Sequence, residues 1–271
     1  MGNDELEWND SFEDAVEALD KVPDNEDAWD QLEEAGQATG RVEAVVAKYK
    51  EVLDRPLEPE VALIVAERCV YFLDEWGEDK DAQLDLLNRV LEIDSTVQWA
   101  FDRASLQLTT SGRWDELLDL YDRVISDTED EARRAALLEE VAHVAKDSAG
   151  NPERAIDYLK QVFALKPGDK LIASALERLL KQKERYRELI DIWNARLKVL
   201  SGDEVLETYH QIAACWLENL NDPGGALAAV ELLLRDESTS AAACQLLEKI
   251  LASPASNRAA RARALEHLSW R

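Results

Sequence analysis

The sequence is poor in glycine and proline, which make turns, and in cysteine, which makes disulfides. Its 271 residues include 10 Gly, 7 Pro, 4 Phe and 3 Cys. So few turn residues argue against sandwiches and barrels, which need a turn about every 8–12 positions. Cys69, Cys215 and Cys244 form no close pair. This spacing excludes a zinc site of the two-pair type and indicates a reducing compartment.

Long apolar runs and targeting signals are also missing. No window approaches the roughly 18 consecutive apolar residues of a membrane-spanning helix. The N-terminus, Met-Gly-Asn-Asp-Glu-Leu, is acidic and lacks the basic and apolar regions of a signal peptide. We therefore expect a cytoplasmic protein.

Positive charge is scarce: 31 Lys and Arg face 57 Asp and Glu, for a net charge of −26. Nucleic acids and anionic membranes repel such a chain, so neither is expected as a partner. Residues 1–40 contain fourteen acids and one base, Lys21, whereas residues 257–271 contain four arginines and one acid. Two interpretations of the acidic end stay open: it keeps the chain soluble, or it attracts a partner rich in lysine and arginine.

What the sequence does contain is an internal repeat. Residues 40–49, 112–121 and 184–193 align without gaps at a step of 72. Apolar residues recur at offsets i, i+1 and i+4, which is one face of a helix. They are Val45, Val46 and Tyr49, then Leu117, Leu118 and Tyr121, then Leu189, Ile190 and Trp193. We expect the three aromatic residues to be buried between repeats.

A second set lies halfway between these segments, at 151–167 and 222–238, and begins with Asn151-Pro152 and Asp222-Pro223. Asn or Asp caps the free amides of a helix, and Pro suits its first position. Each 72-residue period therefore holds two helical hairpins. The expected helices are an unpaired one at 11–22, followed by the pairs 26–39/41–54, 59–76/80–93, 95–111/114–127, 130–148/152–165, 169–183/186–200, 203–220/223–235 and 239–252/257–270.

Such two-helix units resemble the tetratricopeptide repeat (TPR) family. Trp29, Leu32, Gly40 and Tyr49 match the first-helix pair, the turn glycine and the aromatic of the second helix. Glu33, Ser105 and Glu177 depart from the pattern, which prefers Gly there. The resemblance implies an all-α fold, a right-handed α-solenoid of antiparallel helix pairs over residues 1–271 as a single domain. The C-terminal end carries no polar capping helix, which leaves open a complete array or a part of a longer one.

Signatures of catalysis are lacking. The histidines His143, His210 and His267 are far apart, and His143 aligns with Val70 and Cys215, so we expect a packing position there. The sequence has no phosphate-binding glycine loop, GxSxG, HExxH or EF-hand motif. We expect a protein that is not an enzyme and needs no cofactor or metal. A catalytic solenoid remains a third hypothesis.

The TPR resemblance implies a scaffold that binds a partner peptide or helix in a groove lined by the first helices. Transferring the groove positions of the family selects nine residues: Asp27, Asp30, Glu34, Gln37, Trp99, Asp102, Thr109, Arg178 and Lys181. The first unit offers acids where the peptide-carboxylate clamp of the family needs Lys, Asn and Arg, so a binder of chaperone tails is not expected. A partner rich in lysine and arginine stays one of the two open interpretations of the acidic end. The alternative is an acidic chaperone or nucleic-acid mimic that binds basic proteins through overall charge. The oligomeric state stays open.

Overall fold

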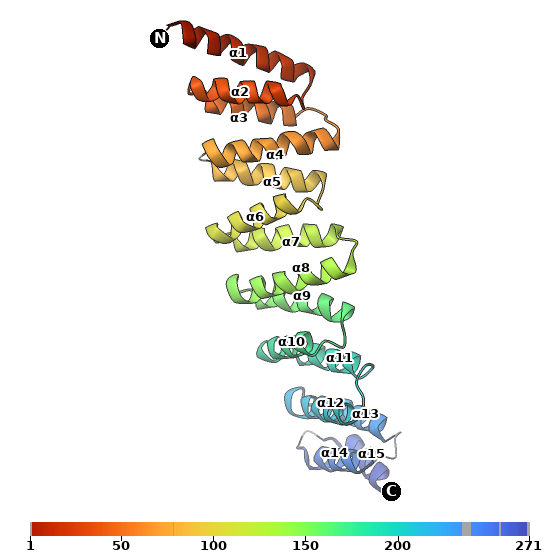
Figure 1. Cartoon of the computed structure of the whole chain (residues 1–271). Coiled ribbons are helices and arrows are strands. Elements are labelled where there is room, and N and C mark those ends of the chain that lie inside the picture. Colours follow the sequence, from red (N-terminus) through yellow and green to blue (C-terminus); the bar gives the residue numbers. More distant parts are fainter. Residues whose placement is uncertain (1, 78, 235–239, 255, 270–271) are drawn as a thin grey trace. The chain divides into compact units, whose positions relative to one another are not determined.

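The computed structural model describes residues 2–77, 79–234, 240–254 and 256–269, and every regular element in those ranges is a helix (Figure 1). The predicted all-α class is therefore confirmed. The chain divides into two compact units, residues 1–129 and 130–271, which we call unit 1 and unit 2. The single domain expected over residues 1–271 stays a prediction.

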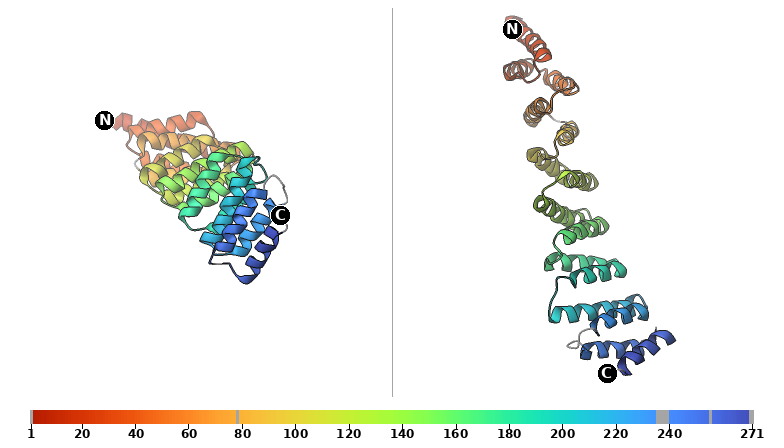
Figure 2. Two further views of the ribbon diagram at one scale, coloured as in Figure 1. Left: turned by 90° about the horizontal axis from the view of Figure 1, so that it is seen from below. Right: turned by 90° about the vertical axis from the view of Figure 1, so that its right-hand side faces the viewer.

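Unit 1 is a stack of antiparallel helix pairs in which each helix contacts the next along the chain. In the end-on view of Figure 2, α2, α4 and α6 form one row and α3, α5 and α7 the other. The first helices therefore share one face. The helices are α1 (Gly2–Lys21), α2 (Glu26–Ala38), α3 (Val42–Leu53), α4 (Pro59–Trp76), α5 (Lys80–Ile93), α6 (Gln98–Ser111) and α7 (Trp114–Asp127).

Unit 2 repeats this plan, with each helix packed on its successor. Two of its first helices end in a short π-helix. The elements are α8 (Glu131–His143), η1 (Val144–Ser148), α9 (Pro152–Leu165), α10 (Lys170–Gln182), α11 (Tyr186–Arg196), α12 (Asp203–Ala214), η2 (Cys215–Asn219), α13 (Pro223–Leu233), α14 (Ser240–Ala252) and α15 (Arg258–Ser269).

The predicted helix starts at Asn151-Pro152 and Asp222-Pro223 are confirmed. The Asn151 side chain accepts a hydrogen bond from the amide of Arg154, and Asp222 accepts from Gly224 and Gly225. These bonds satisfy amides that have no partner within the helix.

The 72-residue repeat appears in the backbone of the turns. Gly40, Gly112 and Glu184 all have positive φ, at 71°, 68° and 55°. The left-handed conformation suits glycine, so the glutamate at the third position adopts the conformation that its two glycine counterparts adopt without strain. The chain is therefore a periodic structure at the level of individual dihedral angles.

An arginine follows each of these turns and holds its hairpin to the preceding one. The Nη1 of Arg113 donates to Asp81 at 2.6 Å, and that of Arg185 donates to Glu153 at 2.7 Å. Arg41 donates to Asn9 at 3.4 Å. The three acceptors are themselves 72 residues apart, so the same contact recurs in each copy.

The repeated aromatic residues are buried, as predicted: Tyr49, Tyr121 and Trp193 are at most 3% exposed. Tyr49 stacks on Trp29 with ring centroids 3.9 Å apart, and Tyr121 meets Phe101 edge-on at 5.1 Å. These contacts join the two helices of each hairpin.

Several helix boundaries differ from the expectation. The unpaired helix expected at 11–22 begins at Gly2 and ends at Lys21. The helix expected at 186–200 ends at Arg196. Helices expected at 130–148 and 203–220 change into π-helices, whose i→i+5 bonds insert an extra residue.

The expected packing role of His143 is wrong, because its side chain is 74% exposed. The sequence alignment paired Gly150 with Asp222. In the structure Gly150 corresponds instead to Asn221, since both have positive φ. The buried Cys215 therefore corresponds to Val144 rather than to His143. Cys69 is also buried, and burial raises the pKa of its thiol to about 12.

Candidate functional site

The candidate site lies on the shared face of α2, α4 and α6 in unit 1, which we call the first-helix face. Positions three or four residues apart form one stripe along each helix. The stripes adjoin, because Arg68 of α4 pairs with Asp30 of α2 and Arg103 of α6 lies over the ring of Tyr71 of α4. We define the face by Asp27, Asp30 and Glu34 on α2, Ile64, Arg68 and Tyr71 on α4, and Trp99, Arg103 and Leu106 on α6.

Large apolar side chains are exposed on this face. Ile64 is 50% exposed, Tyr71 56% and Leu106 65%. Trp99, one turn before Arg103, is half-buried. Single exposed apolar residues are common on protein surfaces, but neighbouring ones along adjoining stripes are typical of an interaction surface.

Arg68 links α4 to α2 through a polar network. Its guanidinium pairs with Asp30, and its Nε donates to Glu33 at 2.8 Å. Glu33 also accepts a hydrogen bond from the hydroxyl of the buried Tyr49. Burial and the Glu33 carboxylate raise the pKa of Tyr49, so the phenol stays protonated and donates. The network fixes the spacing of the first two stripes.

Arg103 links α6 to α4 in a similar way. It pairs with Asp74, and its guanidinium carbon lies 4.8 Å from the ring centroid of Tyr71. The positive charge over the ring face is a favourable cation–π contact. Tyr71 is therefore held in place although it is exposed.

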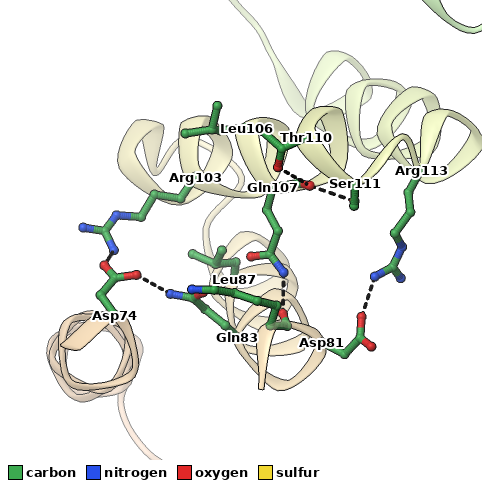
Figure 3. Close-up of a pocket in the computed structure, with 11 residues that line it drawn as sticks. Asp74, Asp81, Gln83, Leu87, Arg103, Leu106, Gln107, Thr110, Ser111 and Arg113 are labelled. Carbon is green, nitrogen blue, oxygen red and sulfur yellow. Dashed lines mark hydrogen bonds and ion pairs between the residues drawn. The ribbon is translucent and has the colours of Figure 1, made fainter. Parts of the chain in front are cut away.

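A pocket of about 680 Å³ opens beside Arg103, between the end of α4, the start of α5 and α6 (Figure 3). Its polar walls are joined by hydrogen bonds and ion pairs. Gln83 donates to Asp74 at 2.5 Å, and Arg113 pairs with Asp81 at 2.6 Å. Leu106 lines the same pocket. The apolar stripe of α6 therefore continues into a concave surface.

The structure brings together only part of the predicted groove in unit 1. Asp27, Glu34, Gln37, Asp102 and Thr109 are exposed, and Asp102 accepts a hydrogen bond from Gln98 at 2.7 Å. The prediction passed over α4, and on α6 it omitted Arg103 and Leu106. One signal was present in the sequence: residues 59–76 are apolar around most of the helix, more than one buried face requires.

Although Lys21 is the one base within residues 1–40, bases from outside that segment pair with several of its acids. Asp20 pairs with Lys48 and Arg55, which hold the pKa of its carboxyl down at about 2. Asp30 and Glu33 pair with Arg68. The bases come from helices that fold back onto the acidic end, which a count along the sequence misses. Asp27 and Glu34 stay exposed, with no ion pair recorded among the described residues.

Arg178 and Lys181, predicted for the same groove, lie on α10 in unit 2 and are exposed. The Nζ of Lys181 is 5.3 Å from the ring centroid of Trp193. Lys181 and Trp193 line a pocket of about 330 Å³ together with other residues of α11, α12 and η2. The nine predicted residues thus belong to two separate surfaces, one in each unit.

Two searches of the described residues concern other kinds of site. No cluster of three or more His, Cys, Asp or Glu side chains there is arranged to hold a metal ion. None of the helices in those same ranges combines the length and the apolar character needed to cross a bilayer.

Comparisons with known proteins match the fold and not a sequence family. No family model matches the chain, and no curated protein matches it. The C-terminal part of a TPR repeat-containing protein from Cytophaga hutchinsonii is 12% identical, covers 96% of each chain and has a TM-score of 0.35. A TPR protein from Parabacteroides merdae is 13% identical over 95% of this chain and 98% of its own, with a TM-score of 0.33.

PilF from Pseudomonas aeruginosa is 16% identical over 82% of this chain and 96% of its own, with a TM-score of 0.30. The antiparallel helix pairs described above show the repeat fold that the sequence predicts.

Proposed function

We propose that this protein is a non-enzymatic interaction scaffold whose first-helix face binds a segment of a partner protein. The segment presents apolar side chains beside lysine or arginine. The observation that carries the proposal is the exposure of Ile64, Tyr71 and Leu106 on adjoining first helices.

The apolar part of the proposed contact involves two helices and a concavity. Tyr71 is held by Arg103, so little conformational freedom is lost when a partner covers it. Leu106 borders the pocket of about 680 Å³, which has room for more than one partner side chain. A held aromatic ring next to a pocket is the usual anchor of an interface.

The charged part of the contact comes from α2 and α6. Asp27, Glu34 and Asp102 are exposed carboxylates. Basic groups of a partner approach them faster than neutral groups, because long-range attraction steers the encounter. Asp30 is excluded from this role because it pairs with Arg68.

The test compares two double variants of the full chain. Tyr71→Ala with Leu106→Ala removes the exposed apolar side chains of the first-helix face. Ile93→Ala with Leu232→Ala removes exposed apolar side chains of similar size from α5 and α13. A partner is captured from a lysate, identified and purified, and its dissociation constant is measured. We expect the first pair to weaken binding at least about tenfold and the second less than about twofold.

Equal weakening by both pairs, or by neither, contradicts the proposed site. In that case the alternative gains support, an acidic chaperone or nucleic-acid mimic that acts through the net charge of −26. Raising the salt concentration separates the two functions. A complex held by overall charge dissociates at moderate salt, whereas one anchored by apolar side chains weakens less.

The acids have a test of their own. Asp27→Lys with Glu34→Lys reverses the two charges of the first-helix face on α2 that have no recorded ion pair, and it leaves the Arg68 network intact. We expect a slower association rate with the purified partner, most clearly at low salt, and little change in the dissociation rate. An unchanged association rate, together with new self-association, shows instead that the acids keep copies apart.

A further inference from the structure

The pocket of about 330 Å³ in unit 2 arises where two large side chains of the repeat are replaced by smaller ones. The helix-capping residues Asp79 and Asp222 align the copies, so that Cys215 corresponds to Phe72 and Gln211 to Arg68. In unit 1, Phe72 packs near Tyr49 with ring centroids 6.1 Å apart. In unit 2, Cys215 and Gln211 line an open pocket beside Trp193, the counterpart of Tyr49.

The same substitution pattern leaves a buried donor without an acceptor. The hydroxyl of Tyr49 donates to Glu33. The corresponding glutamate in unit 2, Glu177, pairs with Arg196 at 2.7 Å instead. The indole Nε1 of Trp193 is buried and has no hydrogen-bond partner among the described residues. Buried polar groups are normally paired, so the packing around Trp193 satisfies the indole less well than the packing around Tyr49 satisfies its hydroxyl.

The charged side chain in the lining of the pocket is basic, and two further bases lie close to lining residues in sequence. Arg178, Lys181 and Arg187 are exposed, and no ion pair is recorded for them within the described part of the chain. Lys181 lines the pocket, whereas none of its lining residues is acidic. Glu218 lies next to the lining residue Asn219 but is not part of the wall. In a chain with a net charge of −26, such a site favours an acidic ligand.

The floor of the pocket is apolar. Tyr186, Leu189 and Ala214 line it together with Cys215. The thiol of Cys215 is neutral at physiological pH, because burial raises its pKa to about 11. Apolar side chains beside polar groups, here Lys181, Gln211 and Asn219, are the usual lining of a side-chain binding site.

We propose that this pocket binds a partner segment in which a bulky apolar side chain stands beside a carboxylate. The apolar side chain fills the space that corresponds to Phe72 in unit 1. The carboxylate faces Lys181 at the edge of the pocket, and the segment covers the wall formed by Trp193. The site differs in place and in charge from the first-helix face, so either site stands if the other fails.

The first experiment uses a defined probe with the full chain. The probe is a fluorescein-labelled peptide of about ten residues, acetylated and amidated at its ends, with a central Phe flanked by Glu. Blocked ends ensure that only side-chain carboxylates are tested. We expect saturable binding in fluorescence polarisation. Replacing Phe by Ala, or Glu by Lys, should weaken it at least about tenfold. Absence of saturable binding to the wild-type chain overturns the proposal.

Variants of the protein locate the binding. Cys215→Phe restores the side chain of the first copy and should weaken binding at least about tenfold by filling the pocket. Lys181→Gln removes one surface charge and should weaken it about three- to tenfold. Lys249→Gln, an exposed lysine on α14, is the matched control and should change it less than twofold. Wild-type affinity in both Cys215→Phe and Lys181→Gln overturns the proposal.

A third readout does not depend on the fold of Cys215→Phe. The indole N–H resonance of Trp193 is assigned by comparison with Trp193→Phe, and the probe peptide is added to the wild-type chain. We expect that resonance to shift and to exchange more slowly with solvent when the peptide binds. An unmoved resonance at saturating peptide shows that the peptide binds elsewhere and contradicts the proposal.

Discussion

A residue's position in this repeat fixes its burial, and its own chemistry then decides its partner. Glu33, Ser105 and Glu177 occupy one repeat position on α2, α6 and α10. Glu33 binds Tyr49 and Arg68, and Glu177 binds Arg196. The buried hydroxyl of Ser105 has no partner among the described residues. One half-buried position therefore supports three different local arrangements.

Truncating Tyr121 tests the burial of the repeated aromatic. Its ring is 3% exposed and meets Phe101 edge-on. Tyr121→Ala should lower the free energy of unfolding by about 3–5 kcal/mol, as large truncations in cores do. Tyr71→Ala is the control, since that ring is 56% exposed and should matter by less than about 1 kcal/mol. Urea denaturation followed by circular dichroism measures both, and equal stabilities contradict the repeat alignment.

Glu188 makes the stability of unit 2 depend on pH. Hydrogen bonds from Arg185, at 2.6 Å, and from Lys160 lower the pKa of Glu188 from 4.5 to about 2. A lowered pKa stabilises the folded state above pH 4.5, and this contribution is lost as the pH falls towards 2. Glu188→Gln should therefore be less stable than wild type at pH 7, with a smaller difference near pH 3. Thermal melts at both pH values check this, and a pH-independent difference contradicts it.

At the scale of elements, turns and caps set the period of the array. The first helices α2, α6 and α10 are followed by a residue with positive φ, and α8 and α12 pass through a π-helix before such a residue, whereas α4 ends at Gly77 with φ of −94°. The π-helices η1 and η2 have identical closing bonds: Ala149 donates to Val144, and Leu220 donates to Cys215. Asp79, Asn151 and Asp222 then cap the second helices α5, α9 and α13. The hairpin is thus defined by its ends, and its apolar face only has to fill the space between them.

In the turn between α10 and α11, the residue with positive φ is not a glycine. Glu184 has φ of 55°, where the other two copies have glycine. A residue with a side chain is strained in the left-handed conformation by roughly 1 kcal/mol. Glu184→Gly should therefore raise the free energy of unfolding by about 0.5–1 kcal/mol.

Asn221→Gly is the matched control, with φ of 54° at the corresponding kind of turn. Asparagine tolerates this conformation better than glutamate, so the gain should be smaller. Urea denaturation of the two variants side by side gives the comparison. A destabilised Glu184→Gly shows that the glutamate side chain makes a contact worth more than the strain.

At the scale of the whole molecule, stability is distributed along the chain. Each unit has its own buried residues, such as Leu117 and Leu118 in unit 1 and Val230 and Leu247 in unit 2. In repeat structures, stability is approximately a sum of contacts between neighbouring hairpins. Each unit therefore contains the contacts that it needs to fold.

Residues 1–129 and 130–271, produced separately, should each fold. We expect helical circular dichroism spectra and a cooperative thermal transition for both. Their core clusters and turn arginines are internal to each unit, as in the pair of Arg113 with Asp81. The full chain under the same buffer is the control. A half that stays unfolded, or that melts without a transition, shows that its stability depends on the other half.

The sequence by itself determined the helices, their pairing and the buried aromatic positions. These follow from periodicity and from capping residues, which act within a few residues along the chain. Tyr49, Tyr121 and Trp193 were identified because the same helix face must be covered in every copy. Connections too short for anything but antiparallel neighbours then fixed the all-α fold.

Only the tertiary structure decided which charges and surfaces are free. Arg68 neutralises Asp30 from a position 38 residues further along the chain, so a local count of charge could not show that Asp30 is paired while Asp27 and Glu34 are exposed without a recorded ion pair. The exposure of Tyr71 and the pocket at Cys215 depend on contacts between successive hairpins. Such contacts join residues far apart in sequence, and for that reason the candidate sites emerged from the fold.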